Sequence, residues 1–302
     1  MKKIGIVGRG FVGSAVQFGF SAETGCDAEV RVYDKDPLKS THTLEETINE
    51  SDFIFVSVPT PSNRNGSMNI DILESVLSDI QKVNRRGGNI ILVRSTVLPG
   101  TTNALAKKFT KLNIVFNPEF LTESSAKFDF INQSRFIIGG RKRFTARVAD
   151  LFRWRFGDSM PIIETTWETA EMVKYMNNRF FATKVSFMNE MKLVAEKQGN
   201  IDWDMAVEGF IRDGRVGHSH IHVPGPDGKK GFGGSCFPKD MQAMISFGED
   251  LGMDLNTLQG AWETNCEVRP ERDWEKLEGR AIVTETKNGE TKYRQETTKR
   301  SS

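Results

Sequence analysis

The fold of this chain is decided at its start, in the stretch Lys3-Ile4-Gly5-Ile6-Val7-Gly8-Arg9-Gly10-Phe11-Val12-Gly13. An apolar, strand-like run leads directly into a G-x-G-x-x-G pattern. The glycines permit a tight turn, close approach of a diphosphate and close packing of a strand on a helix. The helix that follows would offer unpaired N–H groups to phosphates. We therefore predict a dinucleotide-binding βα turn, with Gly8, Gly10, Phe11, Val12 and Gly13 at the cofactor. The alternative is a glycine-rich turn without a ligand, which the strand before it and the helix after it disfavour.

The nature of the dinucleotide is indicated by Asp34, which ends the second strand-like run. A carboxylate at this place binds both hydroxyls of a ribose and repels a 2′-phosphate. It therefore favours NAD over NADP. The nearby Lys35 and Lys39 weaken that preference, and Lys39 is itself a candidate cofactor contact.

The first 165 residues alternate apolar runs with helix-like stretches, which indicates βαβ units. The runs are short and almost continuously apolar, as in strands buried on both faces. We predict a Rossmann-type, doubly wound parallel α/β sheet over residues 1–165. Its strands are expected at 3–8, 28–34, 53–59, 89–95, 113–117, 135–139 and 161–164, with helices between several of them, including 69–83 and 100–110.

The pattern changes after residue 165. One long helix is predicted over 166–199, followed by helix at 202–212, a loop rich in Gly, Pro and His at 213–235, and a helical stretch at 238–265. We assign 166–266 to an all-α domain that is built on the long helix. The remainder, 267–302, is expected to be a truncated C-terminal segment, with a strand at 277–283 and a disordered tail at 284–302, where Tyr293 is the sole apolar side chain.

Composition excludes several classes of protein. The 302 residues carry a net charge of +1, so no overall field favours nucleic acid or an anionic membrane. No apolar stretch is long enough for a membrane span, and the N-terminus lacks the layout of a signal peptide. Three cysteines make no disulfide framework. We expect a cytoplasmic protein.

The chemistry is concentrated in Gly231-Phe232-Gly233-Gly234-Ser235-Cys236-Phe237-Pro238-Lys239-Asp240. Pro238 suits the first turn of a helix, so Cys236 should lie at a helix N-terminus. The helix dipole and a nearby cation would lower the pKa of the thiol there. Asp240 lies one turn further, on the same face. The alternative, a buried and inert cysteine, suits Cys26 and Cys266 better than a cysteine among glycines.

Two further groups join this cluster. Lys174 and Asn178 are four residues apart on the long helix and share a face. The alternative for Lys174 is a solvated side chain paired with Glu171, whereas Asn178 is disfavoured in a helix without a partner. Glu119 and Glu123 follow the fifth strand, and the loops at Ser95-Thr96 and Thr60-Pro61 follow the fourth and third. All should open on the edge where doubly wound folds bind ligands.

Over residues 1–266, the chain resembles the UDP-glucose/GDP-mannose dehydrogenase family. The resemblance is carried by GRGFVG, VPTP, STVLPGTT, NPEFLTESSA, ETAEMVKYMNNRFFATKVSFMNEM, DGRVG and GFGGSCFPKD, in that order. It implies oxidation of the C6 alcohol of a nucleotide sugar to a carboxylate with two NAD. UDP-glucose is the best guess for the substrate and GDP-mannose is close behind.

The resemblance also implies roles for single residues. Cys236 would capture the aldehyde as a thiohemiacetal, which becomes a thioester after the second hydride transfer. Lys174 and Asn178 would stabilise negative charge on oxygen. Thr96, Glu119 and Asp240 would activate water and relay protons. Further contacts are expected with the cofactor (Thr60, Pro61, Ser95, Thr96, Glu123, Lys239) and the substrate (Glu119, Phe120, Leu121, Thr122, Glu123, Lys174, Asn178, Arg215, Phe232, Gly233).

The match ends before a third, nucleotide-gripping domain of the family, so we expect base recognition to be absent. Lys229 and Lys230 could offer charge to the substrate diphosphate in its place. His218, His220 and His222 would face one side of an extended loop, where contact with substrate or a subunit interface is favoured over a metal site. We predict no metal.

Two other functions stay open from the sequence. One is a two-electron dehydrogenase of the β-hydroxyacid type, which uses Lys and Asn on the long helix and needs no thiol. The other is a non-catalytic oligomer that binds NAD or a nucleotide sugar. In each case the apolar residues spread around the long helix predict a homodimer through residues 166–265, with Arg215 reaching the neighbouring subunit, as the family resemblance implies.

Overall fold

The computed structural model describes residues 1–283, so the disordered tail predicted for 284–302 lies outside the described residues. Its centre is a seven-stranded sheet in the order β2-β1-β3-β4-β5-β6-β7. The strands are β1 (Lys2–Val7), β2 (Ala28–Tyr33), β3 (Phe53–Val56), β4 (Ile90–Val93), β5 (Ile114–Phe116), β6 (Phe136–Gly139) and β7 (Ile162–Thr165). All seven lie where strands were predicted.

The predicted parallel sheet is correct for β1 to β5 but wrong for the last two strands. β6 pairs antiparallel with β5 through Phe116 and Gly139, and β7 runs parallel to β6. The chain reaches β6 through the short helix α5 (Ala126–Ile131). β5 and β6 are paired at one position alone, Phe116 with Gly139. The sheet is therefore doubly wound and mostly parallel.

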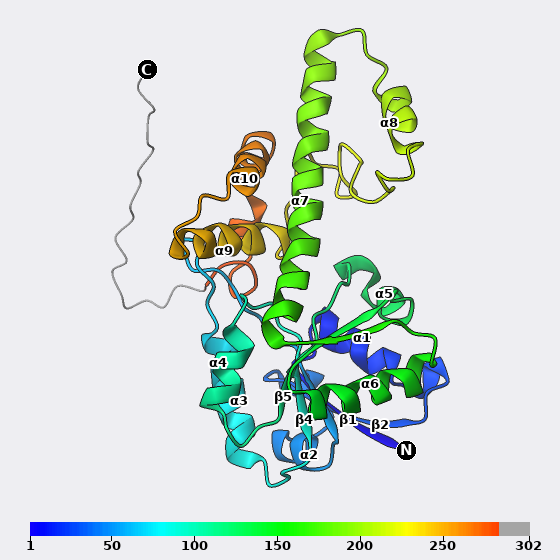
Figure 1. The fold of residues 1–302 in the computed structure, drawn as a ribbon, viewed down its shortest axis with the longest axis vertical. Coiled ribbons are helices and arrows are strands. Elements are labelled where there is room, and N and C mark those ends of the chain that lie inside the picture. The colour runs from blue at the N-terminus through cyan, green and yellow to red at the C-terminus, as the bar shows by residue number, and fades with distance from the viewer. Residues whose placement is uncertain (284–302) are drawn as a thin grey trace.

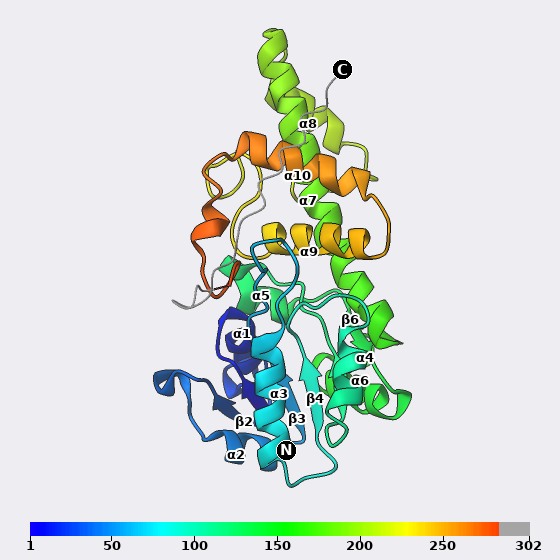
Figure 2. The same cartoon turned by 90° about the vertical axis from the view of Figure 1, so that its left-hand side faces the viewer.

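Helices cover both faces of the sheet, which explains why β3 to β6 are buried throughout. One face packs on α1 (Phe11–Gly19), α5 and α6 (Lys142–Phe156). The other packs on α2 (Leu44–Asn49), α3 (Asp71–Val83) and α4 (Thr101–Lys108). The two layers are visible on either side of the strands in Figures 1 and 2.

The long helix is α7, Trp167–Gln198, of 32 residues. Thr166 begins it by accepting a hydrogen bond from Thr169 N, and Gly199 ends it in the left-handed conformation. Ala170 in its first turns packs into the core of the sheet domain, whereas its far half extends beyond the sheet (Figure 1). The division at residue 165 stays a prediction, since α7 contributes to both cores.

The helices after α7 lie where they were predicted, except that one predicted helical stretch is divided in two. α8 (Trp203–Ile211) lies as expected, but the stretch 238–265 is broken into α9 (Phe237–Asp250) and α10 (Asn256–Val268). Gly252 between them has φ +72°, a left-handed conformation that interrupts a helix. Both helices pack beside α7 around Ala182, Met241 and Ala261.

The strand predicted at 277–283 is also wrong. The residues form a turn, with isolated bridges from Ile282 to Glu278 and to Ser62. Four short 3-10 helices complete the described elements: Ala22–Thr24, Pro37–Lys39, Glu123–Ser125 and Asp273–Lys276.

Candidate active site

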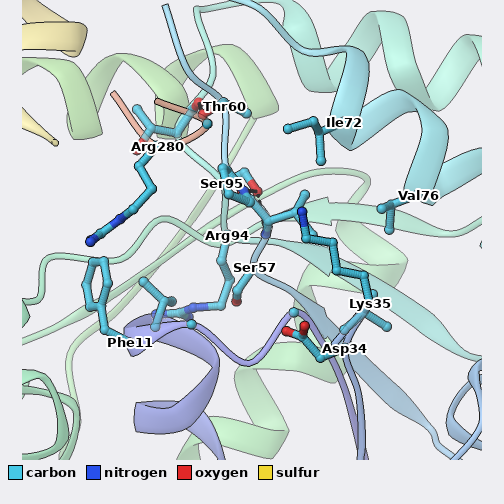
Figure 3. Close-up of a pocket in the computed structure, with 18 of the residues that line it drawn as sticks. Phe11, Asp34, Lys35, Ser57, Thr60, Ile72, Val76, Arg94, Ser95 and Arg280 are labelled. Carbon is cyan, nitrogen blue, oxygen red and sulfur yellow. Dashed lines mark hydrogen bonds between the residues drawn. The ribbon is translucent and has the colours of Figure 1, made fainter. Parts of the chain in front are cut away.

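A cavity of about 830 Å³ opens at the carboxyl ends of β1 to β4, between the sheet, the N-terminus of α9 and residues 278–280. Figure 3 shows it with Asp34 and Phe11 on its floor. Most of the predicted cofactor residues line it, together with the thiol: Gly8, Gly10, Phe11, Val12, Asp34, Lys39, Thr60, Ser95, Thr96, Glu119, Glu123, Cys236 and Lys239. The fold thus brings the predicted cofactor-binding residues and Cys236 to one cavity.

The glycine-rich turn leaves room for a ligand. Gly8 has φ +91°, and a Cβ on Gly13 would lie 2.0 Å from the carbonyl oxygen of Gly8, so neither position tolerates a side chain. A Cβ on Gly10, in contrast, would meet nothing within 4 Å. Gly10 begins α1 and no side chain caps the helix, so the N–H groups of the first turn remain open to the cavity. These features fit the diphosphate of a dinucleotide.

Asp34 holds a fixed carboxylate at the end of β2. Its Oδ2 accepts a hydrogen bond from Arg9 N at 2.5 Å and its Oδ1 one from Asp36 N at 2.9 Å. Acceptor capacity remains for two hydroxyls of a ribose. The arrangement fits NAD, as expected.

The predicted catalytic residues of α7 and α9 contact one another near Cys236: Asn178 on α7 bonds Asp240 on α9. Cys236 is the residue before α9 and faces the cavity. Asp240 is 1% exposed and accepts hydrogen bonds from Asn178 Nδ2 at 3.0 Å and from Lys239 Nζ at 2.5 Å. Arg179 Nη2 lies 3.8 Å from Asp240 Oδ2, the oxygen that also accepts from Asn178. Burial acts to raise the pKa of Asp240, but the charges of Lys239, Arg179 and Lys174 outweigh it, so the net effect is a lowered pKa that keeps the carboxyl ionised.

Lys174 is buried and pairs with Glu119, which excludes the solvated pairing with Glu171. Its Nζ donates to Glu119 Oε1 at 3.0 Å and to the Glu119 carbonyl. Glu171 instead accepts the N–H groups of Gly100 at 2.6 Å and Thr102 at 2.7 Å, at the N-terminus of α4. Burial nevertheless raises the pKa of Glu171 to about 7.

The pKa of the thiol does not follow the prediction from its place at a helix N-terminus. Burial raises the pKa of Cys236, and the carboxylates of Glu119 and Asp240 raise it further, while Lys239 and Lys174 lower it. The physical reason is that a closed site withdraws water from the thiolate. The raised pKa favours the thiol form of Cys236 over the thiolate in this structure.

The site as a whole carries an excess of buried positive charge. Its buried cations and carboxylates are Lys174, Arg179 and Lys239 against Glu119 and Asp240. Arg179 was not found from the sequence. It is 4% exposed, donates to the Phe237 carbonyl at 2.7 Å, and leaves Nε and Nη2 without a hydrogen-bond partner among the described residues. A thiolate or an anionic intermediate at Cys236 would balance the charge.

The loop before Cys236 is held by two buried asparagines that sequence reasoning missed. Asn265 accepts from Phe232 N at 2.6 Å and donates to the Phe232 carbonyl at 3.0 Å, and Asn189 accepts from Gly231 N at 3.1 Å. A Cβ on Gly233 would lie 2.4 Å from the guanidinium of Arg269. Glycines here therefore allow close packing rather than mobility.

Arg94 was also missed, although a charged residue at the end of an apolar run is a signal that could have found it. It lines the cavity, is 1% exposed and donates to Asn117 Oδ1 at 2.5 Å. Its guanidinium lies over the rings of Phe55 and Phe130, at 5.9 and 5.8 Å from the centroids. Burial lowers the pKa of Arg94 to about 10.

Several predicted residues lie outside the cavity. Arg215 is exposed and pairs with Asp213, Lys229 pairs with Glu271, and Lys230 pairs with Glu196. Neither lysine lines this cavity, and their predicted contact with the substrate diphosphate stays a prediction. Gly13, Pro61, Phe120, Leu121, Thr122, Phe232 and Gly233 do not line the cavity, and neither do Lys174, Asn178 and Asp240, which reach it through their neighbours.

The three histidines do not share one side. His220, with φ +61°, stacks on Phe181 at a centroid distance of 4.2 Å, while His218 and His222 are exposed. In residues 1–283 no group of three His, Cys, Asp or Glu side chains could hold a metal ion. Within the same residues, no helix is long and apolar enough to cross a membrane.

The fold and this cavity define a dinucleotide-binding protein with a helical second domain. Family models agree: "UDP-glucose/GDP-mannose dehydrogenase family, NAD binding domain" matches residues 21–154, and the central domain of the same family matches 168–267. The chain belongs to the UDP-glucose/GDP-mannose dehydrogenase family, and its N-terminal domain is the NAD-binding one.

Curated relatives agree with this assignment. UDP-glucose 6-dehydrogenase TuaD of Bacillus subtilis is 30% identical over 89% of this chain and 64% of its own length. UDP-glucose 6-dehydrogenase of Rhizobium meliloti is 34% identical over 82% of this chain and 56% of its own length. The chain thus spans less than two thirds of the length of these relatives.

Solved structures show the same fold. UDP-glucose dehydrogenase of Pyrobaculum islandicum is 29% identical with a TM-score of 0.75, covering 92% of this chain and 70% of that chain. A 3-hydroxyisobutyrate dehydrogenase of Mycobacterium tuberculosis is 17% identical with a TM-score of 0.69, over 90% of this chain and 95% of that one. The second likeness concerns the fold alone.

Proposed function

We propose that this chain is an NAD-dependent nucleotide-sugar dehydrogenase that oxidises the C6 alcohol of its substrate to a carboxylate in two steps. UDP-glucose is the first candidate substrate and GDP-mannose the second. The observation that carries the proposal is the position of Cys236, which lines one cavity with the glycine-rich turn and Asp34. A thiol has no role in a two-electron alcohol oxidation, whereas it retains an aldehyde between two oxidations.

NAD, when bound, accepts a hydride from C6 in each oxidation. In the first, the hydroxyl proton passes to a base at Glu119 or Asp240, directly or through water near Thr96. The Cys236 sulfur then bonds to the aldehyde carbon, and the aldehyde oxygen becomes the hydroxyl of a thiohemiacetal. Lys174 and Asn178 stabilise negative charge on that oxygen.

Loss of the second hydride and the hydroxyl proton converts the thiohemiacetal to a thioester. Water then adds to the thioester carbonyl, the carbon–sulfur bond breaks, and the carboxylate leaves with Cys236 restored as a thiol. The excess of buried positive charge supports this order of steps, because each step passes through an anion on sulfur or on oxygen. Lys174, Arg179 and Lys239 outnumber the two buried carboxylates beside them.

The proposal includes a homodimer. α7 leaves a run of large apolar side chains exposed, at 39% to 64% of their surface: Met172, Met176, Phe180, Phe187, Met191 and Val194. Their spacing of three, four and seven residues places them along one face of the helix, and exposed apolar patches of this kind mark protein interfaces. A second copy on this face would also bring Arg215 to a neighbouring site. The cytoplasmic location stays a prediction.

The experiment is a panel of UDP- and GDP-hexoses with NAD, in which NADH is counted per sugar consumed. Two NADH per sugar is the expected result. Cys236→Ala should abolish the second NADH, while Cys266→Ala, which removes a partly buried thiol on α10, is the matched control. One NADH per sugar, unchanged by Cys236→Ala, would contradict the four-electron proposal and support the two-electron alternative.

A further inference from the structure

The 277–283 segment is fixed to the loop that follows β3. Ser62 N donates to the Ala281 carbonyl at 2.9 Å, and Val283 N donates to the Ser62 carbonyl at 3.0 Å. Ser62 and Ala281 are buried, at 2% and 1% exposure. The hydroxyl of Ser62 also donates to the Lys239 carbonyl at 3.2 Å, which joins the segment to α9.

The residues before the segment are equally well anchored. Trp274 is 1% exposed, and its ring lies 5.3 Å from that of Trp262 on α10. The 277–283 segment therefore passes from the helical part of the chain to the sheet part with both ends held. Between these ends, Glu278, Gly279 and Arg280 form a wall of the cofactor cavity.

Arg280 points into this cavity. In Figure 3 its side chain starts near Thr60 and extends toward Phe11, in the first turn of α1. Its Nη2 donates to Glu123 Oε1 at 2.7 Å, and the two side chains are 47% and 55% exposed. An exposed ion pair of this kind contributes little to stability, so its partner can be exchanged without loss of the fold.

The other cations that line the cavity are Lys35, Lys39, Arg94 and Lys239. Lys35 lies with Asp34 at the opposite end of the view in Figure 3, and Lys239 is bonded to Asp240. Arg94 lines the cavity as a buried side chain; its guanidinium lies over the rings of Phe55 and Phe130, and its Nε and Nη2 have no hydrogen-bond partner among the described residues. The glycine-rich turn supplies backbone N–H groups rather than a charge. Of the two arginines among the described residues that line the cavity, Arg280 is the exposed one, and it extends toward Phe11 at the N-terminus of α1 (Figure 3).

We propose that Arg280 binds the diphosphate of the dinucleotide, from the wall opposite the glycine-rich turn, and exchanges the carboxylate of Glu123 for a phosphate oxygen. A guanidinium pairs with a phosphate through two parallel N–H groups. The exposed carboxylate of Glu123 can give up its place to that phosphate. The inference rests on the proposed cofactor site. It concerns the diphosphate of the dinucleotide and not that of the substrate, for which Lys229 and Lys230 were predicted.

The test measures binding of NAD and of adenosine to the whole 302-residue chain by isothermal calorimetry, with adenosine titrated in competition with NAD. Arg280→Gln should weaken NAD binding about tenfold, since a charge-assisted contact is lost. Binding of adenosine, which has no phosphate, should stay unchanged. Lys276→Gln is the control, because Lys276 is exposed on the same stretch and does not line the cavity.

Glu123→Gln gives a second and opposite readout. The substitution frees Arg280, so it should tighten NAD binding when Arg280 is present. In the Arg280→Gln background, the same substitution should change NAD binding much less. Unchanged NAD binding in Arg280→Gln would overturn the inference, and so would equal losses for NAD and adenosine, which indicate a structural role. If the wild-type chain binds no NAD, the proposed function fails together with the inference; if it binds NAD and Arg280→Gln binds equally, only the inference fails.

Discussion

Replacement of Asn265 by alanine tests whether the loop before the thiol is held as the structure indicates. The side chain is fully buried and bonds both backbone groups of Phe232, at 2.6 and 3.0 Å. Asn265→Ala leaves a buried N–H and a buried C=O without partners, each of which costs about 1–3 kcal/mol. With partial rehydration of the space, we expect the free energy of unfolding to fall by about 3 kcal/mol.

The assay is urea unfolding followed by tryptophan fluorescence, since Trp262 and Trp274 lie beside the loop. For a slope of roughly 2–3 kcal/mol per molar urea, the midpoint should drop by about 1–1.5 M. Alkylation of Cys236 should become faster, because the loop that precedes it loses the two hydrogen bonds that hold Phe232. Asn256→Ala, at an exposed position of the same helix, is the control. A midpoint shift no larger than that of the control would refute the reasoning.

Three further predictions concern charged groups. Burial raises the pKa of Glu171 from about 4.5 to about 7; the native state then binds this proton more tightly than the unfolded state, so its contribution to stability falls by roughly 3 kcal/mol as pH rises from 4.5 to 7. Urea midpoints at pH 5 and pH 8 should show that fall in wild type relative to Glu171→Gln, and a difference between the two proteins that is the same at both pH values would count against it. Arg179→Met removes a buried cation 3.8 Å from Asp240, so the rate of Cys236 alkylation should reach its midpoint at a higher pH than in wild type, and an unchanged profile would exclude the electrostatic role. Asp34→Asn should weaken NAD binding about tenfold and reduce the preference for NAD over NADP, because one charge and its ribose contacts are lost; calorimetry with both dinucleotides checks this, and a preserved preference would contradict it.

The fold was readable because its signals are local. The alternation of buried runs with helices placed every strand of the sheet, and it does not depend on which strands become neighbours. The antiparallel joining of β6 was not readable, since it depends on a single pairing between Phe116 and Gly139. The break at Gly252 was missed because the residues around it keep helical periodicity, although the glycine itself, with its φ of +72°, was a local signal for the end of a helix.

The sequence by itself determined the glycine-rich turn, Asp34 and the place of Cys236 before a helix, because each depends on residues that are adjacent in the chain. Only the tertiary structure decided the partners of these groups. Lys174 meets Glu119 across 55 positions, and Arg280 meets Glu123 across 157. The raised pKa of the Cys236 thiol could likewise not be predicted from the sequence, since it is set by burial and by charges from three separate segments. Spacing along a chain defines which side chains share a face, whereas desolvation and long-range pairing depend on what packs against that face.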